Sequence, residues 1–264
     1  MTKLRVENLS VTIDGNELVS PVSFTLTPGE LVIMLGPNGA GKTLTLQHAI
    51  GLGRSSGGTA TLSDQDTHTM PPITRAQHLT YLPQTRPLAW PLRVRDLVAL
   101  GRFAHGTRLG HLSKPDTDAI NTALEACDIA HLANRKASTL SGGELARVHC
   151  ARAFAATTPL LVADEPVAAL DPRHQFAIMN LFRAFVDQGG GALIVLHDIT
   201  LAAKYADRLI WMKDGHLVAD GTPADTLTPE RLAEIYGVQA TLTNGQPHIP
   251  VSYTHLTLPT KRIV

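Results

Sequence analysis

The sequence has little cysteine, few aromatic residues, no excess of either charge and no long apolar run. Its only two cysteines, Cys127 and Cys150, lie in segments with helical patterns, which disfavours a disulfide or zinc framework and suits a reducing compartment. Basic and acidic residues number 23 each, so no strongly basic field is present to bind nucleic acid. No apolar run approaches the roughly 18 residues of a membrane helix, and no signal segment is evident. We therefore expect a cytosolic chain that does not itself span a membrane.

The apolar pattern along the 264 residues predicts an α/β fold. Alternating apolar and polar residues on both sides of Asp14-Gly15-Asn16 predict antiparallel strands in the first 30 residues. Three later runs, "LVIML", "LLVA" and "ALIVL", are continuously apolar and are typical of parallel strands covered on both faces. Only helical patterns occur between about residues 87 and 156, which predicts a helical insertion. A hairpin at Asp214-Gly215 and a helix capped by Thr228 follow.

The stretch "LGPNGAGKTLTL" lies between an apolar run and a helical pattern. Gly36, Gly41, Lys42 and Thr43 match G-x-x-x-x-G-K-[ST] in the strand-loop-helix context that this motif requires. Such a loop turns its backbone amides around phosphate, while the lysine reaches the β- and γ-phosphates and the hydroxyl binds Mg²⁺. The alternative is a glycine-rich turn that only packs a helix on a strand, which the eight-residue match disfavours. The predicted nucleotide contacts are Gly36, Pro37, Asn38, Gly39, Ala40, Gly41, Lys42, Thr43 and Thr45.

Two further stretches separate an ATPase from other phosphate-loop proteins. In "LLVADEP", Asp164 ends an apolar strand, where it can hold Mg²⁺ through water, and Glu165 can take a proton from an attacking water. In "LSGGELARVHCARA", Ser141 and the following glycines open a helix and form a second anion site. One chain has little use for two such sites on one γ-phosphate, so the second site is expected to close over nucleotide held by another copy. Alone, "SGG" is more often a linker or a helix cap.

With these stretches in order, residues 4–238 resemble the nucleotide-binding subunit of an ATP-binding cassette (ABC) transporter. The resemblance implies that Gln84 in "YLPQ" senses Mg²⁺ and touches the membrane subunits, that Asp171 in "AALD" lies at a dimer seam, and that His197 in "VLHD" contacts the γ-phosphate. Alone, His197 would be an ordinary strand-end histidine and Gln84 a plain loop amide. The signature residues implied to act on the other copy's ATP are Leu140, Ser141, Gly142, Gly143 and Glu144.

The implied architecture is a phosphate-loop ATPase core with an N-terminal antiparallel β element and an inserted helical subdomain. Residues 1–86 and 157–238 would form the core, residues 87–156 the helical subdomain and residues 239–264 a tail. Two head-to-tail copies would sandwich two ATP and Mg²⁺. Lys42, Glu165, His197 and Gln84 are the predicted catalytic residues, and Thr43, Gln84 and Asp164 are the predicted Mg²⁺ ligands.

The sequence departs from the family pattern at three places. By its spacing from the phosphate loop, Ile13 stands where an aromatic residue usually stacks on adenine, so we expect weak discrimination between ATP and GTP. Glu144 replaces a more usual glutamine and adds a negative charge beside a polyphosphate. The final stretch Tyr253–Val264 has no amphipathic period and resembles read-through of cloning DNA, so we expect its deletion to leave ATPase activity intact.

Within the family, "YLPQ" followed by "PLRVRDLVALGRFAHG" is most similar to ATPases of importers for iron-siderophore complexes, haem or cobalamin. This implies a peripheral protein on the cytoplasmic face of a bacterial inner membrane, bound to two permease subunits and served indirectly by a substrate-binding protein, with no nucleic-acid partner. The alternatives are a soluble cassette ATPase of DNA repair or translation, an exporter or other transporter subunit, and a phosphate-loop enzyme outside the family.

Overall fold

A six-stranded sheet with the order β10-β9-β3-β8-β7-β6 forms the centre of the computed structural model, which describes residues 2–84, 91–108, 110–168, 170–238, 241–243 and 246–248. All neighbouring strands are parallel except β9 and β10. The sheet is covered on both faces: Leu31 and Ile33 pack into the core on the helical side, whereas Val32 and Met34 pack into a second core on the other side. The strands are β3 (Leu31–Leu35), β6 (Leu79–Leu82), β7 (Leu160–Asp164), β8 (Gly191–Val195), β9 (Arg208–Lys213) and β10 (His216–Gly221).

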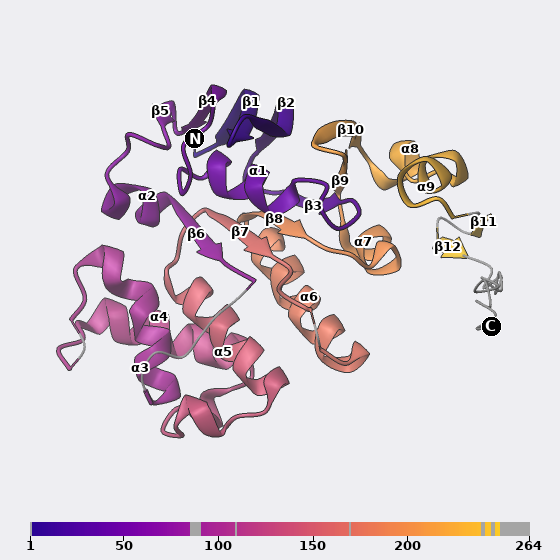
Figure 1. Cartoon of the computed structure of the whole chain (residues 1–264). Coiled ribbons are helices and arrows are strands. Elements are labelled where there is room, and N and C mark those ends of the chain that lie inside the picture. Colours follow the sequence, from indigo (N-terminus) through magenta and orange to yellow (C-terminus); the bar gives the residue numbers. More distant parts are fainter. Residues whose placement is uncertain are drawn as a thin grey trace, which may run out of the picture.

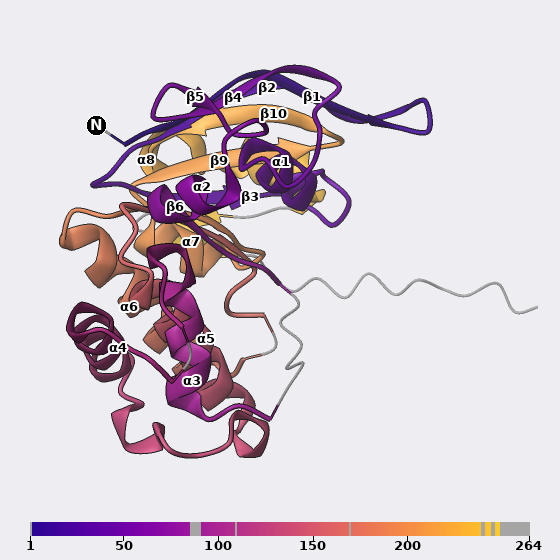
Figure 2. The same ribbon diagram turned by 90° about the vertical axis from the view of Figure 1, so that its left-hand side faces the viewer.

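A four-stranded antiparallel sheet with the order β2-β1-β4-β5 covers that second core. The alternating apolar residues of the N-terminal hairpin point into it, and Asp14 and Gly15 turn the hairpin with φ of 51° and 79°. Helix α1 (Lys42–Ala49) lies between the two sheets and buries Leu46 in this core (Figure 2). The strands are β1 (Leu4–Ile13), β2 (Asn16–Leu26), β4 (Gly57–Leu62) and β5 (Gln65–Asp66).

Helices occupy the segment between β6 and β7, on the side of the main sheet opposite β1 and β2 (Figure 1). Within the described residues 91–108 and 110–156 only helices and two isolated bridges occur, as the pattern predicts. Ile120, Ala123, Leu124 and Cys127, which follow the i, i+3, i+4, i+7 spacing of one helix face, are all buried. The elements are α3 (Val94–Ala99), η1 (Leu100–His105), α4 (Lys114–Ala126), η2 (Ala130–Leu132), η3 (Ala137–Thr139) and α5 (Gly142–Ala155).

The remaining helices pack around the main sheet. Helix α6 buries Ile178 and Phe182 on one face. Thr228 caps α9, as predicted, by accepting a hydrogen bond from the Arg231 amide at 3.1 Å. No helix among the described residues is long and apolar enough to cross a membrane. Tyr253–Val264 lies outside the described residues. The elements are α2 (Pro72–His78), α6 (Pro172–Asp187), α7 (Ile199–Tyr205), α8 (Pro223–Thr226), α9 (Pro229–Tyr236), β11 (Thr241–Thr243) and β12 (Gln246–His248).

Candidate functional site

The loop between β3 and α1 depends on two glycines that neighbouring strands approach closely. Gly36 has a φ of 153°, and a Cβ there would collide with the carbonyl oxygen of Met212 on β9. Gly41 has a φ of 89°, and its Cβ would lie 3.1 Å from the carbonyl oxygen of Leu18 on β2. The glycines therefore allow the loop to lie against both sheets in a left-handed backbone that side chains disfavour.

The lysine of the loop is held by the loop itself. Lys42 is 6% exposed, and its Nζ donates hydrogen bonds to the carbonyl oxygens of Gly36 at 2.7 Å and Pro37 at 2.9 Å. Burial lowers the pKa of Lys42, while the carboxylates of Glu165 and Asp164 act in the opposite direction. The ammonium group is thus fixed inside the turn whose amides would surround a phosphate.

Asp164 carries the feature that best fits a divalent cation. It ends β7 at 1% exposure, and within the described part of the chain its Oδ1 accepts no hydrogen bond. Burial raises the pKa of Asp164, although a hydrogen bond from the Thr43 side chain opposes this shift. A buried carboxylate oxygen without a donor, beside a hydroxyl group, is a suitable oxygen environment for Mg²⁺ or for one of its water ligands.

Three residues from three neighbouring strand ends meet beside Asp164. Along the chain, Glu165 comes directly after β7, Gln84 comes shortly after β6 and His197 comes shortly after β8. Gln84 Nε2 donates to Glu165 Oε2 at 2.7 Å, and His197 Nε2 is hydrogen-bonded to Glu165 Oε1. Glu165 itself has a φ of 47°, a left-handed conformation that is rare for glutamate, and its amide donates to the Val195 carbonyl oxygen at 3.2 Å. Strained backbone thus aims this carboxylate at the other two side chains.

These groups line one pocket of about 880 Å³. Five of the residues predicted to contact nucleotide or Mg²⁺ within one chain are not among its lining residues: Ile13, Gly36, Pro37, Thr45 and Asp164. Thr45 is 0% exposed with its hydroxyl turned into the interior, and Leu44 lines the pocket in its place. Leu18 is likewise an unpredicted lining residue; as an exposed apolar residue beside buried Val19, it breaks the alternation of β2. The lining residues are Leu18, Asn38, Gly39, Ala40, Gly41, Lys42, Thr43, Leu44, Gln84, Glu165 and His197.

The signature turn and Asp171 stand outside this pocket, since none of residues 140–144 and 171 lines it. Ser141 caps α5 in a capping box with Glu144, whose Oε2 accepts hydrogen bonds from the Ser141 amide at 2.8 Å and from its hydroxyl at 2.9 Å. The bond from the Ser141 amide is the main cause that lowers the pKa of Glu144, and Arg135, 3.9 Å away, adds to it. An arginine therefore partly offsets the additional charge of this turn.

Known proteins are similar to this chain over most of its length. A model described as ABC transporter matches residues 19–168. The hemin import ATP-binding protein HmuV of Pseudomonas fluorescens is 42% identical over 241 residues, covering 89% of this chain and 93% of that protein. HmuV of Deinococcus radiodurans is 39% identical, covering 91% and 92%. A solved dimeric bacterial ABC transporter cassette is 26% identical with a TM-score of 0.73, covering 83% of this chain and 98% of that one.

Proposed function

This chain belongs to the ABC transporter family and is an ATPase whose hydrolysis is coupled to transport, and we propose that its transporter imports haem into a bacterial cell. Relatives named for hemin import match nearly the full length of the chain, which favours haem among the three ligand classes that the sequence left open. The observation that carries the ATPase assignment is the meeting of Lys42, Glu165 and His197 at one pocket, with the buried Asp164 carboxylate beside them.

We propose that Mg²⁺ and ATP bind in this pocket. The loop amides and Lys42 would surround the β- and γ-phosphates, with Thr43, Asp164 and Gln84 placed to hold Mg²⁺ directly or through water. Bound Mg²⁺ would supply positive charge against the phosphate oxygens. Glu165 would orient the attacking water and accept its proton, while Lys42 and His197 stabilise negative charge on the γ-phosphate.

The missing part of the site would come from a second copy. The residues that line the pocket leave out the whole signature turn, although Ser141 and its neighbouring amides form an anion-binding helix start. Two copies arranged head to tail would place Ser141 of each over the ATP of the other. Hydrolysis would remove this shared ligand and allow the two copies to separate.

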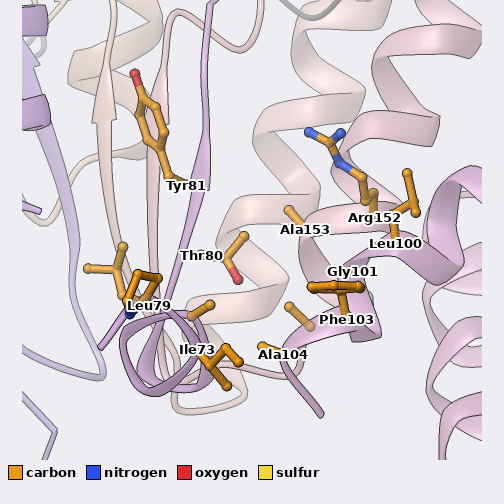
Figure 3. Close-up of a pocket in the computed structure, with 13 residues that line it drawn as sticks. Ile73, Leu79, Thr80, Tyr81, Leu100, Gly101, Phe103, Ala104, Arg152 and Ala153 are labelled. Atoms are coloured by element: carbon orange, nitrogen blue, oxygen red, sulfur yellow. The ribbon is translucent and has the colours of Figure 1, made fainter. Parts of the chain in front are cut away.

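An apolar groove lies between α2, β6, η1 and α5 (Figure 3). We propose that a permease segment docks in this groove on the cytoplasmic side of the membrane. The groove has a volume of about 360 Å³, and its lining includes Ile73 and Phe103, which are 60% and 71% exposed. Large exposed apolar side chains grouped in this way are typical of protein interfaces. Tyr81 also lines the groove and precedes Gln84, whose amide contacts Glu165.

Affinity purification tests the proposal. Tagged Glu165→Gln protein, expressed in its native host, would be isolated with ATP from detergent-solubilised membranes and its partners identified by mass spectrometry. We expect a multi-helix permease and a substrate-binding protein, and we expect haem, but not a siderophore or cobalamin, to stimulate the ATPase of the reassembled complex. Phe103→Ser should lose the permease while His131→Ala, on an exposed surface, retains it. Recovery of soluble proteins or nucleic acid alone would favour a cassette ATPase of DNA repair or translation.

A further inference from the structure

The second glycine of the signature turn lies directly beneath a histidine ring. A Cβ built on Gly143 would stand 2.6 Å from Nε2 and 2.8 Å from Cγ of His174, distances that no real side chain tolerates. The backbone of Gly143 does not have a positive φ, so the close approach of the ring, rather than the local conformation, excludes a side chain here. Gly142 differs, because a Cβ there would meet nothing within 4 Å.

The same ring is anchored to the residue predicted at the dimer seam. Asp171 caps α6, and its Oδ1 accepts a hydrogen bond from the His174 amide at 3.0 Å. The other carboxylate oxygen, Oδ2, lies 2.8 Å from His174 Nδ1. The His174 side chain is only 33% exposed, since one side of its ring covers Gly143. Asp171, His174 and Gly143 therefore form one continuous contact between the starts of α6 and α5.

We propose that His174 is a positioning residue that holds the signature turn against the start of α6, so that Ser141 and Asp171 meet the second copy as one surface. This inference rests on the proposed function, because it concerns how one copy presents its signature turn to the ATP of the other. His174 lies outside the nucleotide pocket and acts through Gly143 and Asp171. Its effect is therefore on assembly of the two-copy site rather than on ATP binding to a single chain.

The geometry makes two substitutions equivalent. A methyl group at position 143 has space only if the imidazole ring swings away, and that movement breaks the hydrogen bond between Nδ1 and Asp171. Gly143→Ala and His174→Ala thus remove the same contact by different routes, so their effects should not add. Asparagine at position 174 keeps a side-chain nitrogen near the position of Nδ1 but lacks the outer part of the ring. His174→Asn should therefore retain the Asp171 contact, but its Cγ and amide oxygen stay close to position 143, so it should not make space for the methyl group that Gly143→Ala introduces.

Steady-state ATPase kinetics of the full chain test this inference. We expect His174→Ala and Gly143→Ala each to lower kcat by about tenfold and KM for ATP to change by less than about twofold. The double variant Gly143→Ala/His174→Ala should be no slower than either single variant. His174→Asn alone should retain most of kcat, because it keeps the contact with Asp171, whereas Gly143→Ala/His174→Asn should be as slow as Gly143→Ala. The exposed histidine variant His131→Ala serves as the matched control.

ATP-dependent dimerisation separates this inference from the proposed function. In the Glu165→Gln background, size-exclusion chromatography should show a dimer with ATP, and adding His174→Ala should weaken it while leaving ATP binding to the monomer unchanged. If the Glu165→Gln protein itself forms no dimer with ATP, the two-copy site is refuted and the inference fails with it. If that dimer forms and His174→Ala neither weakens it nor lowers kcat, only the role of His174 is refuted. Effects of the two single variants that multiply in the double variant would also refute it.

Discussion

The substitution Arg102→Met should destabilise the chain strongly. Arg102 is a buried residue of η1, and its side chain connects this element to α4 and α5. Its Nε lies 3.0 Å from Asp116 Oδ1 in α4, and its Nη1 donates to the Ala155 carbonyl oxygen at 3.1 Å and to Thr157 Oγ1 at 2.7 Å. Both charged side chains are only 8% exposed. Methionine would fill a similar apolar volume but would leave the Asp116 carboxylate and the Ala155 carbonyl without this donor.

Removing one partner of a buried ion pair costs about 3–5 kcal/mol, since the remaining charge stays away from water. For a chain of this size, each kcal/mol lowers the melting temperature by roughly 2–4 °C. Differential scanning calorimetry at pH 7 should therefore show a melting temperature lower by roughly 6–20 °C. The control Arg183→Met removes the more exposed pairs with Asp187 and Asp207 and should cost no more than about 1 kcal/mol. Equal shifts for the two variants would refute the reasoning.

The pH dependence of stability gives a second measure of the same cluster. Hydrogen bonds from Ser113 first, and then from Thr107 and Arg102, hold the pKa of Asp116 well below its usual value. A carboxyl group with a lowered pKa stabilises the fold fully above its unfolded pKa, near 4, and loses that contribution as the pH falls toward its folded value. The parent chain should therefore lose stability below about pH 5 more steeply than Asp116→Asn does. Parallel melting curves for the two proteins across this range would contradict the assignment.

Four further predictions concern the nucleotide site and the tail. Glu165→Gln should retain ATP binding and lose about 10²–10⁴ in turnover, and substantial residual hydrolysis would exclude Glu165 as the base. Gly36→Ala should abolish binding of a fluorescent ATP analogue, because its Cβ meets the Met212 carbonyl oxygen. ATP and GTP should be hydrolysed with kcat/KM values within about tenfold of each other, and a strong preference would show that another group recognises the base. Deletion of Tyr253–Val264 should leave ATPase activity intact, and a marked loss would show that this segment belongs to the fold.

The sequence was informative where a local pattern fixes the backbone. Continuous apolar runs predicted the buried parallel strands, and alternation predicted the N-terminal hairpin. The phosphate loop followed from its glycines and its context. Which residues after Lys42 face the pocket, however, depends on where the helix begins. Helix α1 begins at Lys42, so Thr45 faces the interior while Leu44 lines the pocket, and a count along the sequence did not separate the two.

The contact expected between Ile13 and the base stays a prediction. Ile13 was assigned by its spacing from the phosphate loop, and spacing alone does not determine the register of a strand. The register of β1 against β2 shifts three times, between Val6 and Leu9, between Leu9 and Val11, and between Val11 and Thr12. Each irregularity changes which side chains share a face. Leu18 lines the pocket, and Ile13 is 43% exposed at the end of β1.

The strand order also explains why three distant motifs act on one carboxylate. Strands β8, β7 and β6 are neighbours in the sheet, so the loops after them bring His197, Glu165 and Gln84 together although these residues lie far apart along the chain. Gln84 follows the strand whose Tyr81 lines the apolar groove, and it donates directly to Glu165. If the permease docks in that groove, a shift at the end of β6 would change the hydrogen bond between Gln84 and Glu165 directly. No rearrangement of the hydrophobic core would be needed. Docking and proton transfer would then be coupled through a single amide, so Gln84→Ala should uncouple ATP hydrolysis from transport more than it weakens ATP binding.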